Sequence, residues 1–243
     1  MITACYNAEE TIEKTILSVI NQTYPNIEYI IVDGGSKDGT IDIIKKYSKR
    51  VSCWISESDN GVYDAMNKGI HLAHGEWLNF MNSGDTFVDN DVLLSVFKEE
   101  IPEGKSFIYS DYFVEHKNGI YKKGYTSISK GIILHQSSIY QKCLHSKYGE
   151  YIVTDKYIIS DLLFFLSLPK NCFYKTNVII SKYLGGGISA QGDWCYLQSL
   201  YAKGIFYHYS LSYIIYSAIM RKFINLIPDT IRERIRRIRW DKK

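Results

Sequence analysis

The most constraining feature of this sequence is the alternation, over its first hundred residues, of short β-branched runs with helical patterns. Residues 26–32 and 51–55 have the composition of buried strands, while Ile12, Ile16 and Val19 recur at helical spacing. Such alternation predicts a parallel sheet with helices on both faces, since parallel strands need long crossover connections. At 243 residues the chain is long enough for one large α/β domain, or for one domain with an appendage.

Each predicted strand of this first half runs directly into small or polar residues. The second strand ends in Asp33-Gly34-Gly35-Ser36, the third in residues 56–61, and the fourth, residues 77–81, in Asn82-Ser83-Gly84-Asp85. The carboxyl ends of parallel strands meet at one edge of a sheet, where open α/β sheets bind their ligands. The sequence therefore predicts a ligand crevice at this edge, with the polar groups of these turns gathered beside it.

Four segments of the first half carry a family resemblance. They are Thr3-Ala4-Cys5-Tyr6-Asn7, Val32-Asp33-Gly34-Gly35-Ser36-Lys37-Asp38-Gly39-Thr40, Asp59-Asn60-Gly61-Val62-Tyr63-Asp64-Ala65-Met66-Asn67-Lys68-Gly69 and Asn82-Ser83-Gly84-Asp85. In this order and at these spacings they resemble the successive motifs of the family 2 glycosyltransferases, densely over residues 1–110 and thinly over 130–200. The resemblance implies a GT-A fold with a mostly parallel central sheet. It also implies transfer of a sugar from a nucleotide-sugar with inversion of the anomeric centre.

The resemblance implies that residues 1–110 bind the donor. Asp33 would accept a hydrogen bond from the uracil N3–H of a UDP-sugar, while Thr3 and Tyr6 would line the base and ribose pocket. Asn67 and Lys68 would lie near the sugar and phosphates of the donor. The alternatives are a purely structural turn at Asp33 and a solvated helix face at Asn67 and Lys68.

The fourth motif supplies the candidate for a metal site. Asp85 would hold Mn²⁺ or Mg²⁺ on the donor diphosphate, which gains negative charge as the glycosidic bond breaks. Ser83 and Gly84 would contact the nucleotide-sugar. Many relatives carry Asp-x-Asp-Asp, so the single carboxylate of this chain implies that the phosphates of the substrate complete the site. The alternative is a polar turn that only ends the strand.

Residues 111–204 are expected to form the acceptor half, and Asp161 is their strongest catalytic candidate. This aspartate lies in the apolar segment 157–166, where an unpaired carboxylate is costly and needs a partner or a function. The resemblance implies that Asp161 is the general base that deprotonates the acceptor hydroxyl. Partial burial would raise its pKa, which suits that role. The alternative is a helix cap without a catalytic role.

Three further features of the acceptor half are weaker signals. Asn118-Gly119, between residues of strand character at 114–123, predicts a hairpin. His135, at the start of a predicted strand, could bind the acceptor or a metal, although a lone histidine is more often structural. Gly186 lies in a run of three glycines, which predicts a loop that closes over the donor or the acceptor.

Residues 205–243 differ in composition from the rest of the chain and are expected to form a separate tail. From Arg221 onward nine Lys/Arg stand against three acids, a net charge of +6 that leaves about −3 for the remainder. Apolar residues recur at helical spacing on both sides of Pro228. A basic amphipathic helix with aromatic anchors predicts association with an anionic membrane surface. A solvated or oligomer-forming helix pair is the alternative, and no recognisable nucleic-acid-binding module accompanies the basic residues.

The cysteine pattern and the hydropathy of the sequence indicate the cellular compartment. The five cysteines are widely spaced, and no pair has the spacing of a zinc or redox motif. The sequence contains neither the pattern of a signal peptide nor about 20 uninterrupted apolar residues. We therefore expect a cytoplasmic protein, peripheral on the inner face of the cell membrane.

Together with these features, the resemblance implies a metal-dependent, inverting glycosyltransferase that uses a UDP-sugar and a lipid-linked saccharide acceptor in cell-surface polysaccharide synthesis. One alternative is a sugar-phosphate nucleotidylyltransferase, which shares the sheet type. That class carries a basic glycine-rich loop after its first strand, where this chain has Cys5-Tyr6-Asn7-Ala8. The other alternative, favoured by the reduced metal motif, is a non-catalytic, membrane-docked protein that binds nucleotide-sugars.

Overall fold

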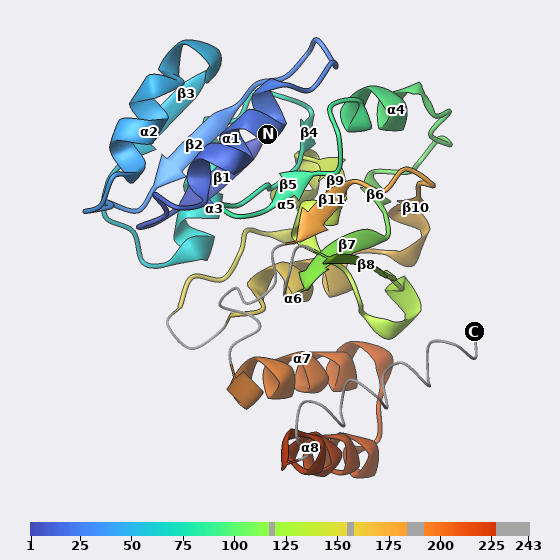
Figure 1. The fold of residues 1–243 in the computed structure, drawn as a ribbon. Helices are drawn as coiled ribbons and strands as arrows, with labels where there is room; N and C mark the ends of the chain where they lie inside the picture. Colours follow the sequence, from blue (N-terminus) through green and yellow to red (C-terminus); the bar gives the residue numbers. More distant parts are fainter. Residues whose placement is uncertain (117–119, 155–157, 184–191, 227–243) are drawn as a thin grey trace. The chain divides into compact units, whose positions relative to one another are not determined.

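The computed structural model describes residues 1–116, 120–154, 158–183 and 192–226 of the chain (Figure 1). The chain divides into two compact units, Met1–Cys195 and Tyr196–Lys243, and helix α7 (Gly192–Tyr207) crosses the division. The first unit has the predicted α/β class. The domain boundary expected after Gly204 stays a prediction.

The N-terminal sheet is wholly parallel, as the alternation of strands and helices predicted. The elements of this half are β1 (Ile2–Cys5), α1 (Ile12–Ile20), β2 (Ile30–Asp33), α2 (Thr40–Lys46), a 3₁₀ turn (Ser48–Arg50), β3 (Cys53–Ser56) and α3 (Val62–Leu72). The strands are hydrogen-bonded in the order β1-β2-β3. Every residue of β1 and β2 is buried, as expected for parallel strands covered on both faces.

The segment predicted as a single fourth strand changes its pairing partner along its length. Its first part, β4 (Trp77–Leu78), pairs antiparallel with β9 (Ser138–Gln141) in a second sheet. The next residues run parallel to β1. There the N–H of Ile2 donates to the carbonyl of Asn79 (2.9 Å), and the N–H of Met81 donates to the carbonyl of Ile2 (3.0 Å). The loop that follows Met81 therefore leaves the sheet beside the end of β1.

The second half of the first unit is built on two sheets of mixed direction. Its further elements are β5 (Thr86–Phe87), α4 (Val92–Lys98), β6 (Phe107–Tyr109), β7 (Tyr112–His116), β8 (Ile120–Gly124), 3₁₀ turns at Ile128–Lys130, His135–Ser137 and Lys170–Cys172, α5 (Cys143–Tyr148), α6 (Ser160–Ser167), β10 (Phe173–Lys175) and β11 (Ser181–Tyr183). The sheet orders are β10-β6-β9-β4 and β5-β11-β7-β8. Among the strand pairs that the structure describes in these two sheets, only β10/β6 and β11/β7 are parallel.

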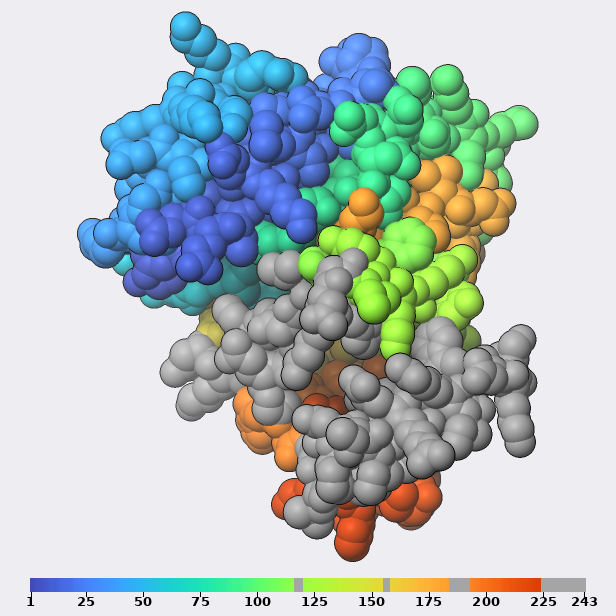
Figure 2. Space-filling model, viewed as in Figure 1, coloured from blue at the N-terminus to red at the C-terminus, as the bar shows by residue number. Residues whose placement is uncertain are grey.

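The predicted hairpin is confirmed as β7 and β8, which pair antiparallel. Its turn residues, Asn118 and Gly119, lie outside the described residues. The hairpin lies at the surface beside the N-terminal half (Figure 2), where Lys14 of α1 and Glu115 of β7 form an ion pair at 3.8 Å. The hairpin therefore borders the first half without entering its core.

The strand predicted to begin at His135 begins three residues later. Residues His135–Ser137 form a 3₁₀ turn, and β9 starts at Ser138. The N–H of Ser137 (3.1 Å) and the hydroxyl of Ser138 (2.7 Å) both donate to the carbonyl of Leu134. These local hydrogen bonds compete with the strand ladder, so a turn carries the His135 side chain.

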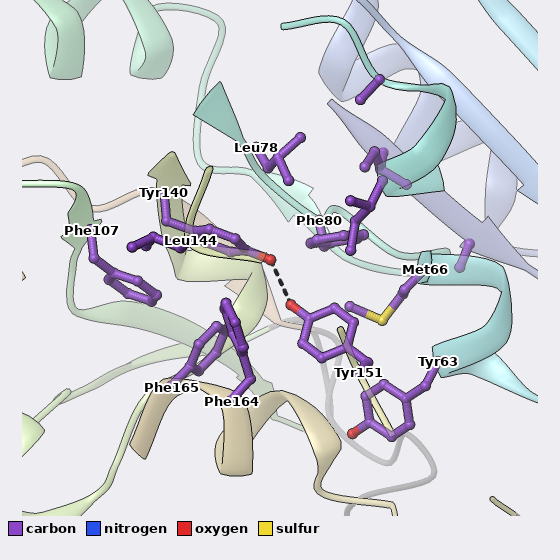
Figure 3. Packing of buried hydrophobic residues seen from close by; sticks show 14 of the residues in the cluster. Tyr63, Met66, Leu78, Phe80, Phe107, Tyr140, Leu144, Tyr151, Phe164 and Phe165 are labelled. Carbon is purple, nitrogen blue, oxygen red and sulfur yellow. Dashed lines mark hydrogen bonds between the residues drawn. The ribbon is translucent and has the colours of Figure 1, made fainter. Parts of the chain in front are cut away.

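The core of the first unit contains a large aromatic cluster (Figure 3). Phe107 and Tyr140 stack with their ring centroids 5.3 Å apart, and Phe165 lies edge-on to Phe107 at 5.0 Å. Phe164 also belongs to this cluster, and both adjacent phenylalanines come from α6. Aromatic pairs of this kind contribute about 1 kcal/mol each beyond the burial of their area. The cluster therefore fixes the position of α6.

The second unit contains α8 (Leu211–Leu226), which exposes many apolar side chains. Leu211 is 71% exposed and Phe223 is 60% exposed. The other exposed apolar residues of this helix are Tyr213, Ile215, Tyr216, Ile219 and Met220. Pro228 and the helix predicted beyond it lie outside the described residues. In the part of the chain that the structure describes, no helix combines the length and hydrophobicity needed to span a membrane.

His145 is a buried histidine of the first unit that is held in its neutral form. Its ring stacks on Phe164 with the centroids 4.2 Å apart. Its Nδ1 donates to the carbonyl of Gly149 (3.0 Å), so its Nε2 accepts from the hydroxyl of Tyr140 (2.9 Å), which also bonds the hydroxyl of Tyr151 (Figure 3). Burial lowers the pKa of His145 from 6.5 to about 4.

We predict that this histidine makes the fold sensitive to mild acid. The folded-state pKa lies below the unfolded one, so the stabilising effect of a neutral His145 is complete above pH 6.5 and is lost as the pH falls toward 4. The free energy of unfolding, measured with urea, should decrease between pH 7.5 and pH 5 by about 2 kcal/mol because of this group.

The variant His145→Gln tests the source of this effect. Glutamine can still accept from Tyr140 and donate to Gly149, but it does not titrate. Its free energy of unfolding should therefore depend less on pH than that of the wild type, while the exposed His74→Gln should behave like the wild type. An unchanged pH dependence in His145→Gln would assign the effect to another group.

Candidate active site

A cavity of about 570 Å³ lies at the carboxyl ends of the N-terminal strands, where the sequence predicted a crevice. Its wall combines the loop after β1, the start of α3, the loop after Met81, the 3₁₀ turn before β9 and the start of α6. Five of the predicted site residues line it, and these are Tyr6, Ser83, Asp85, His135 and Asp161. The fold thus brings together residues from both halves of the first unit.

Asp161 lies in the first turn of α6, and its carboxylate is bonded on both oxygens. Its Oδ1 accepts from the hydroxyl of Tyr63 (2.8 Å) and from the N–H of Leu162 (2.9 Å). Its Oδ2 accepts from Nδ1 of His135 (2.9 Å). The aspartate therefore has partners on α3 and on the turn before β9, and the apolar segment does not leave it unpaired.

The pKa of Asp161 moves in the direction opposite to the expected one. Burial by itself raises this pKa, as predicted from the apolar segment, and it is the largest single effect. The hydrogen bond and charge of His135, with the hydrogen bond from Tyr63, outweigh it and lower the pKa of Asp161 from its ordinary value. The carboxylate of Asp161 is therefore stabilised in its ionised form, and it is a weaker base than the sequence suggested.

His135 has a second partner on its other ring nitrogen. Nε2 of His135 lies 3.3 Å from Nδ2 of Asn82. The orientation of that amide is set by the N–H of Ala4, which can donate only to the amide oxygen of Asn82 (3.2 Å). Since Nδ2 is a donor, Nε2 of His135 is an acceptor here, and its Nδ1 carries the proton toward Asp161.

Asp85 is almost fully buried beneath the cavity, at the end of a turn that requires glycine. Gly84 has φ +99°, a conformation that side chains rarely adopt. The hydroxyl of Thr15 accepts from the N–H of Gly84 (3.0 Å) and donates to the carbonyl of Asp85 (2.8 Å). Helix α1 therefore fixes the backbone that presents Asp85, and the predicted contact of Gly84 with the nucleotide-sugar stays a prediction.

Tyr6 and Ser83 lie on the wall of the same cavity. Tyr6 is 61% exposed and offers a flat aromatic surface. The hydroxyl of Ser83 is 2.8 Å from that of Thr11 in the residues leading into α1. Both positions agree with the predicted contact to a nucleotide-sugar, which stays a prediction.

Thr3 and Asp33 do not line the cavity, and both are fully buried. The hydroxyl of Thr3 donates to the carbonyl of Met81 (2.7 Å). The carboxylate of Asp33 accepts from both the hydroxyl and the N–H of Ser36, and from the hydroxyl of Ser56 (2.6 Å). Burial raises the pKa of Asp33, but these hydrogen bonds together lower it from its ordinary value.

Asn67 and Lys68 are also outside the cavity wall. The amide of Asn67 forms two hydrogen bonds with the backbone of Tyr151, donating to its carbonyl (2.8 Å) and accepting from its N–H (3.1 Å). Lys68 forms an ion pair with Glu57 (2.9 Å) and donates to the carbonyl of Ser58 (3.1 Å). In the structure, both side chains fasten α3 to neighbouring segments.

Three cavity residues carry contacts that the sequence analysis did not single out, namely Asp59, Tyr63 and Asn82. All three lie inside the motifs quoted for the family resemblance. The motifs therefore indicated these segments, but they did not indicate which of the side chains face the cavity. Gly186, predicted in a closing loop, lies outside the described residues.

The acidic residues of the cavity bear on the expected metal. Asp59, Asp85 and Asp161 line it, whereas no Lys or Arg occurs among the described residues of its wall. No group of three or more His, Cys, Asp or Glu that could hold a metal ion occurs in the described ranges. The donor set therefore fits a hard cation that is shared with phosphate oxygens, because Mg²⁺ sites often use only one or two carboxylates.

Residues 1–155 match the family described as Glycosyl transferase family 2, and the chain belongs to that family. Among curated proteins, it is 36% identical over 116 residues to the UDP-Glc:alpha-D-GlcNAc-diphosphoundecaprenol beta-1,3-glucosyltransferase WfaP of Escherichia coli, covering 47% of this chain and 46% of that protein. It is 32% identical over 142 residues to a PGL/p-HBAD biosynthesis glycosyltransferase of Mycobacterium tuberculosis, covering 55% of each chain. The chain thus spans about half the length of these relatives.

Solved structures share the fold at low sequence identity, and the expected GT-A fold is confirmed. TarS 1–349 of S. aureus in complex with UDP-GlcNAc matches with a TM-score of 0.65 and 17% identity, covering 84% of this chain and 64% of that one. The mannosyltransferase PcManGT from Pyrobaculum calidifontis, in complex with GDP-Man and Mn²⁺, matches with a TM-score of 0.65 and 15% identity, covering 84% and 63%.

The variant Asp33→Asn distinguishes a structural carboxylate from a nucleotide contact. Since Asp33 is fully buried and accepts several hydrogen bonds, we expect the free energy of unfolding to fall by about 3 kcal/mol. UDP affinity, measured by calorimetry where the variant is folded, should change little. Asp42→Asn, at an exposed position, is the control for stability. Intact stability with a large loss of UDP affinity would assign Asp33 to the base instead.

Proposed function

We propose that this protein is a glycosyltransferase that moves a sugar from a nucleotide-sugar to a hydroxyl of a saccharide acceptor, with inversion of the anomeric carbon. The observation that carries the proposal is that Asp85 and the His135–Asp161 pair line the same cavity, in a chain that belongs to glycosyltransferase family 2. An inverting transfer needs two functions at one site. It needs stabilisation of a leaving diphosphate and removal of a proton from the attacking hydroxyl.

The donor is proposed to be a UDP-sugar. Tyr6 and Ser83 would contact the donor from the cavity wall. Thr3, Asp33 and Gly84 would hold the loops beside the cavity through their hydrogen bonds. The printed names of WfaP and of the TarS complex refer to UDP-linked sugars, which supports this choice. The GDP-Man complex of the mannosyltransferase shows that a similar fold also accepts another base.

The acidic cavity gives a physical reason for a divalent cation. A diphosphate would meet the charges of Asp59, Asp85 and Asp161 without a compensating Lys or Arg among the described wall residues. We propose that Asp85 holds Mn²⁺ or Mg²⁺ together with the phosphates of the donor. The cation would neutralise the negative charge that develops on the leaving diphosphate.

The acceptor is proposed to be a lipid-linked saccharide at an anionic membrane. The curated relative WfaP is named for an acceptor on diphosphoundecaprenol, a lipid. On α8 the exposed Leu211, Ile215 and Ile219 follow one another at one-turn spacing, as in a helix that lies on a membrane. The excess of Lys and Arg toward the C-terminus would attract anionic lipids. We therefore propose a peripheral location on the cytoplasmic membrane face, in cell-surface polysaccharide synthesis.

The proposed activity is tested by release of UDP from a panel of UDP-sugars, with Mn²⁺ and a lipid-diphosphate saccharide as acceptor. We expect acceptor-dependent UDP release that EDTA abolishes. Asp85→Asn should lower kcat by about 100-fold or more, since it removes a charge from the proposed cation site. Asp89→Asn, an exposed carboxylate four residues further on, should retain full activity. Binding of UDP without any transfer would instead establish a non-catalytic nucleotide-sugar-binding protein.

The membrane proposal is tested on the full chain with vesicles that contain phosphatidylglycerol. The double variant Ile215→Glu, Ile219→Glu should reduce co-sedimentation by about tenfold or more. Both isoleucines are half-exposed, so insertion of the remaining apolar area into the membrane would contribute about 1 kcal/mol for each. Lys49→Glu is the matched control, since it lowers the net charge by the same amount at an exposed position outside the tail. Equal loss in both proteins would indicate a general charge effect.

A further inference from the structure

The His135–Asp161 pair raises the question of which atom accepts the proton of the acceptor hydroxyl. Both oxygens of Asp161 already accept hydrogen bonds, from Tyr63 and Leu162 on one side and from His135 on the other. A hydroxyl that delivered its proton to this carboxylate would have to compete with three donors. The lowered pKa of Asp161 also makes protonation unfavourable.

The other end of His135 is better suited to receive a proton. Its Nε2 is an acceptor, because the amide of Asn82 is oriented by the N–H of Ala4. The contact between Asn82 and Nε2 is long, at 3.3 Å, and a substrate hydroxyl could replace it at little cost. His135 lines the cavity, so Nε2 can meet a substrate there.

We propose that Nε2 of His135 is the atom that removes the proton from the acceptor hydroxyl, and that Asp161 and Tyr63 are positioning residues that act through it. This inference rests on the proposed function. In the step, the acceptor oxygen forms its bond to the anomeric carbon while its proton passes to Nε2. The bond from the anomeric carbon to the diphosphate oxygen breaks, and its electron pair leaves with the nucleoside diphosphate.

The arrangement matches what a histidine base needs from its surroundings. Asp161 holds Nδ1–H, which fixes the tautomer, and it stabilises the imidazolium that forms when Nε2 takes a proton. Tyr63 in turn holds Asp161 from α3. The sequence separates these groups widely, and the packing of α3 and α6 against the turn before β9 assembles them.

The pH dependence follows from the groups that face His135. Burial by itself lowers the pKa of His135, but the hydrogen bond and charge of Asp161 on α6, with the charge of Asp85 in the loop after Met81, raise it from 6.5. Tyr63, which bonds Asp161, and Asn82, which faces Nε2 of His135, are neutral. A cation at Asp85 would offset part of the effect. The wild-type kcat should therefore decrease as the pH falls below the pKa of this histidine.

Acceptor-dependent UDP release by the full-length protein tests the inference. We expect an acid limb in the wild-type kcat profile between pH 5.5 and 8, whereas a carboxylate base with a lowered pKa gives no limb in that range. His135→Gln should lose about 100-fold or more in kcat. The KM for the donor and the melting temperature should stay near the wild-type values. His71→Gln is the matched control, because His71 pairs with Glu150 (2.6 Å) at the surface.

Chemical rescue separates the base from its positioning partner. Added imidazole should restore part of the activity of His135→Ala, whose cavity can admit the ring, but should not restore Asp161→Ala. An active wild type with a flat pH profile, or a His135→Gln variant with nearly full kcat, would overturn this inference and leave the proposed function intact. A wild type that transfers no sugar to any acceptor would overturn the proposed function, and the inference with it.

Discussion

The position of β1 between β2 and the segment after β4 is the constraint on which the site depends. Backbone hydrogen bonds from Ile2 and Met81 join that segment to β1, and the hydroxyl of Thr3 adds a bond to the carbonyl of Met81. Three chain segments therefore end at one edge, and the loop with Asp85 lies beside the loop with Tyr6. Because of this pairing, segments that are distant in the sequence lie side by side and form one wall of the cavity.

Two carboxylates of the first unit, the buried Asp33 and the partly buried Asp161, are compensated by groups of the protein itself. Asp33 is satisfied by the turn that follows its own strand and by Ser56, while Asp161 is satisfied by His135 and Tyr63 from other elements. A buried carboxylate without such partners would cost several kcal/mol or take up a proton. The carboxylate of Asp33 therefore holds the loop that follows its own strand. The carboxylate of Asp161 instead links α6 to α3 and to the turn before β9 at the cavity.

Much of the fold follows from the sequence, because it is encoded locally. The β-branched runs and the polar turns identify β2, β3 and the edge at which they end, and the Asn118-Gly119 pair identifies the hairpin. Side-chain direction at the strand ends is not local. The sequence does not indicate that the side chain of Asp33 is buried against its own loop. Nor does it distinguish this aspartate from Asp85, which lines the cavity. The pairing of His135 with Asp161 depends on tertiary packing, since 26 residues separate them.

Helix α6 couples the stability of the core to the geometry of the site. Phe164 and Phe165 pack into the aromatic cluster, and Asp161 lies one turn before them. A helix that must satisfy both sets of contacts has little freedom to rotate, because a rotation about its axis would disturb the packed rings and the hydrogen bonds of Asp161 together. The apolar composition that makes Asp161 conspicuous in the sequence is thus the same feature that holds it in place. The unexpected lowering of its pKa has the same origin, since the rigid helix keeps the carboxylate within reach of His135 and Tyr63.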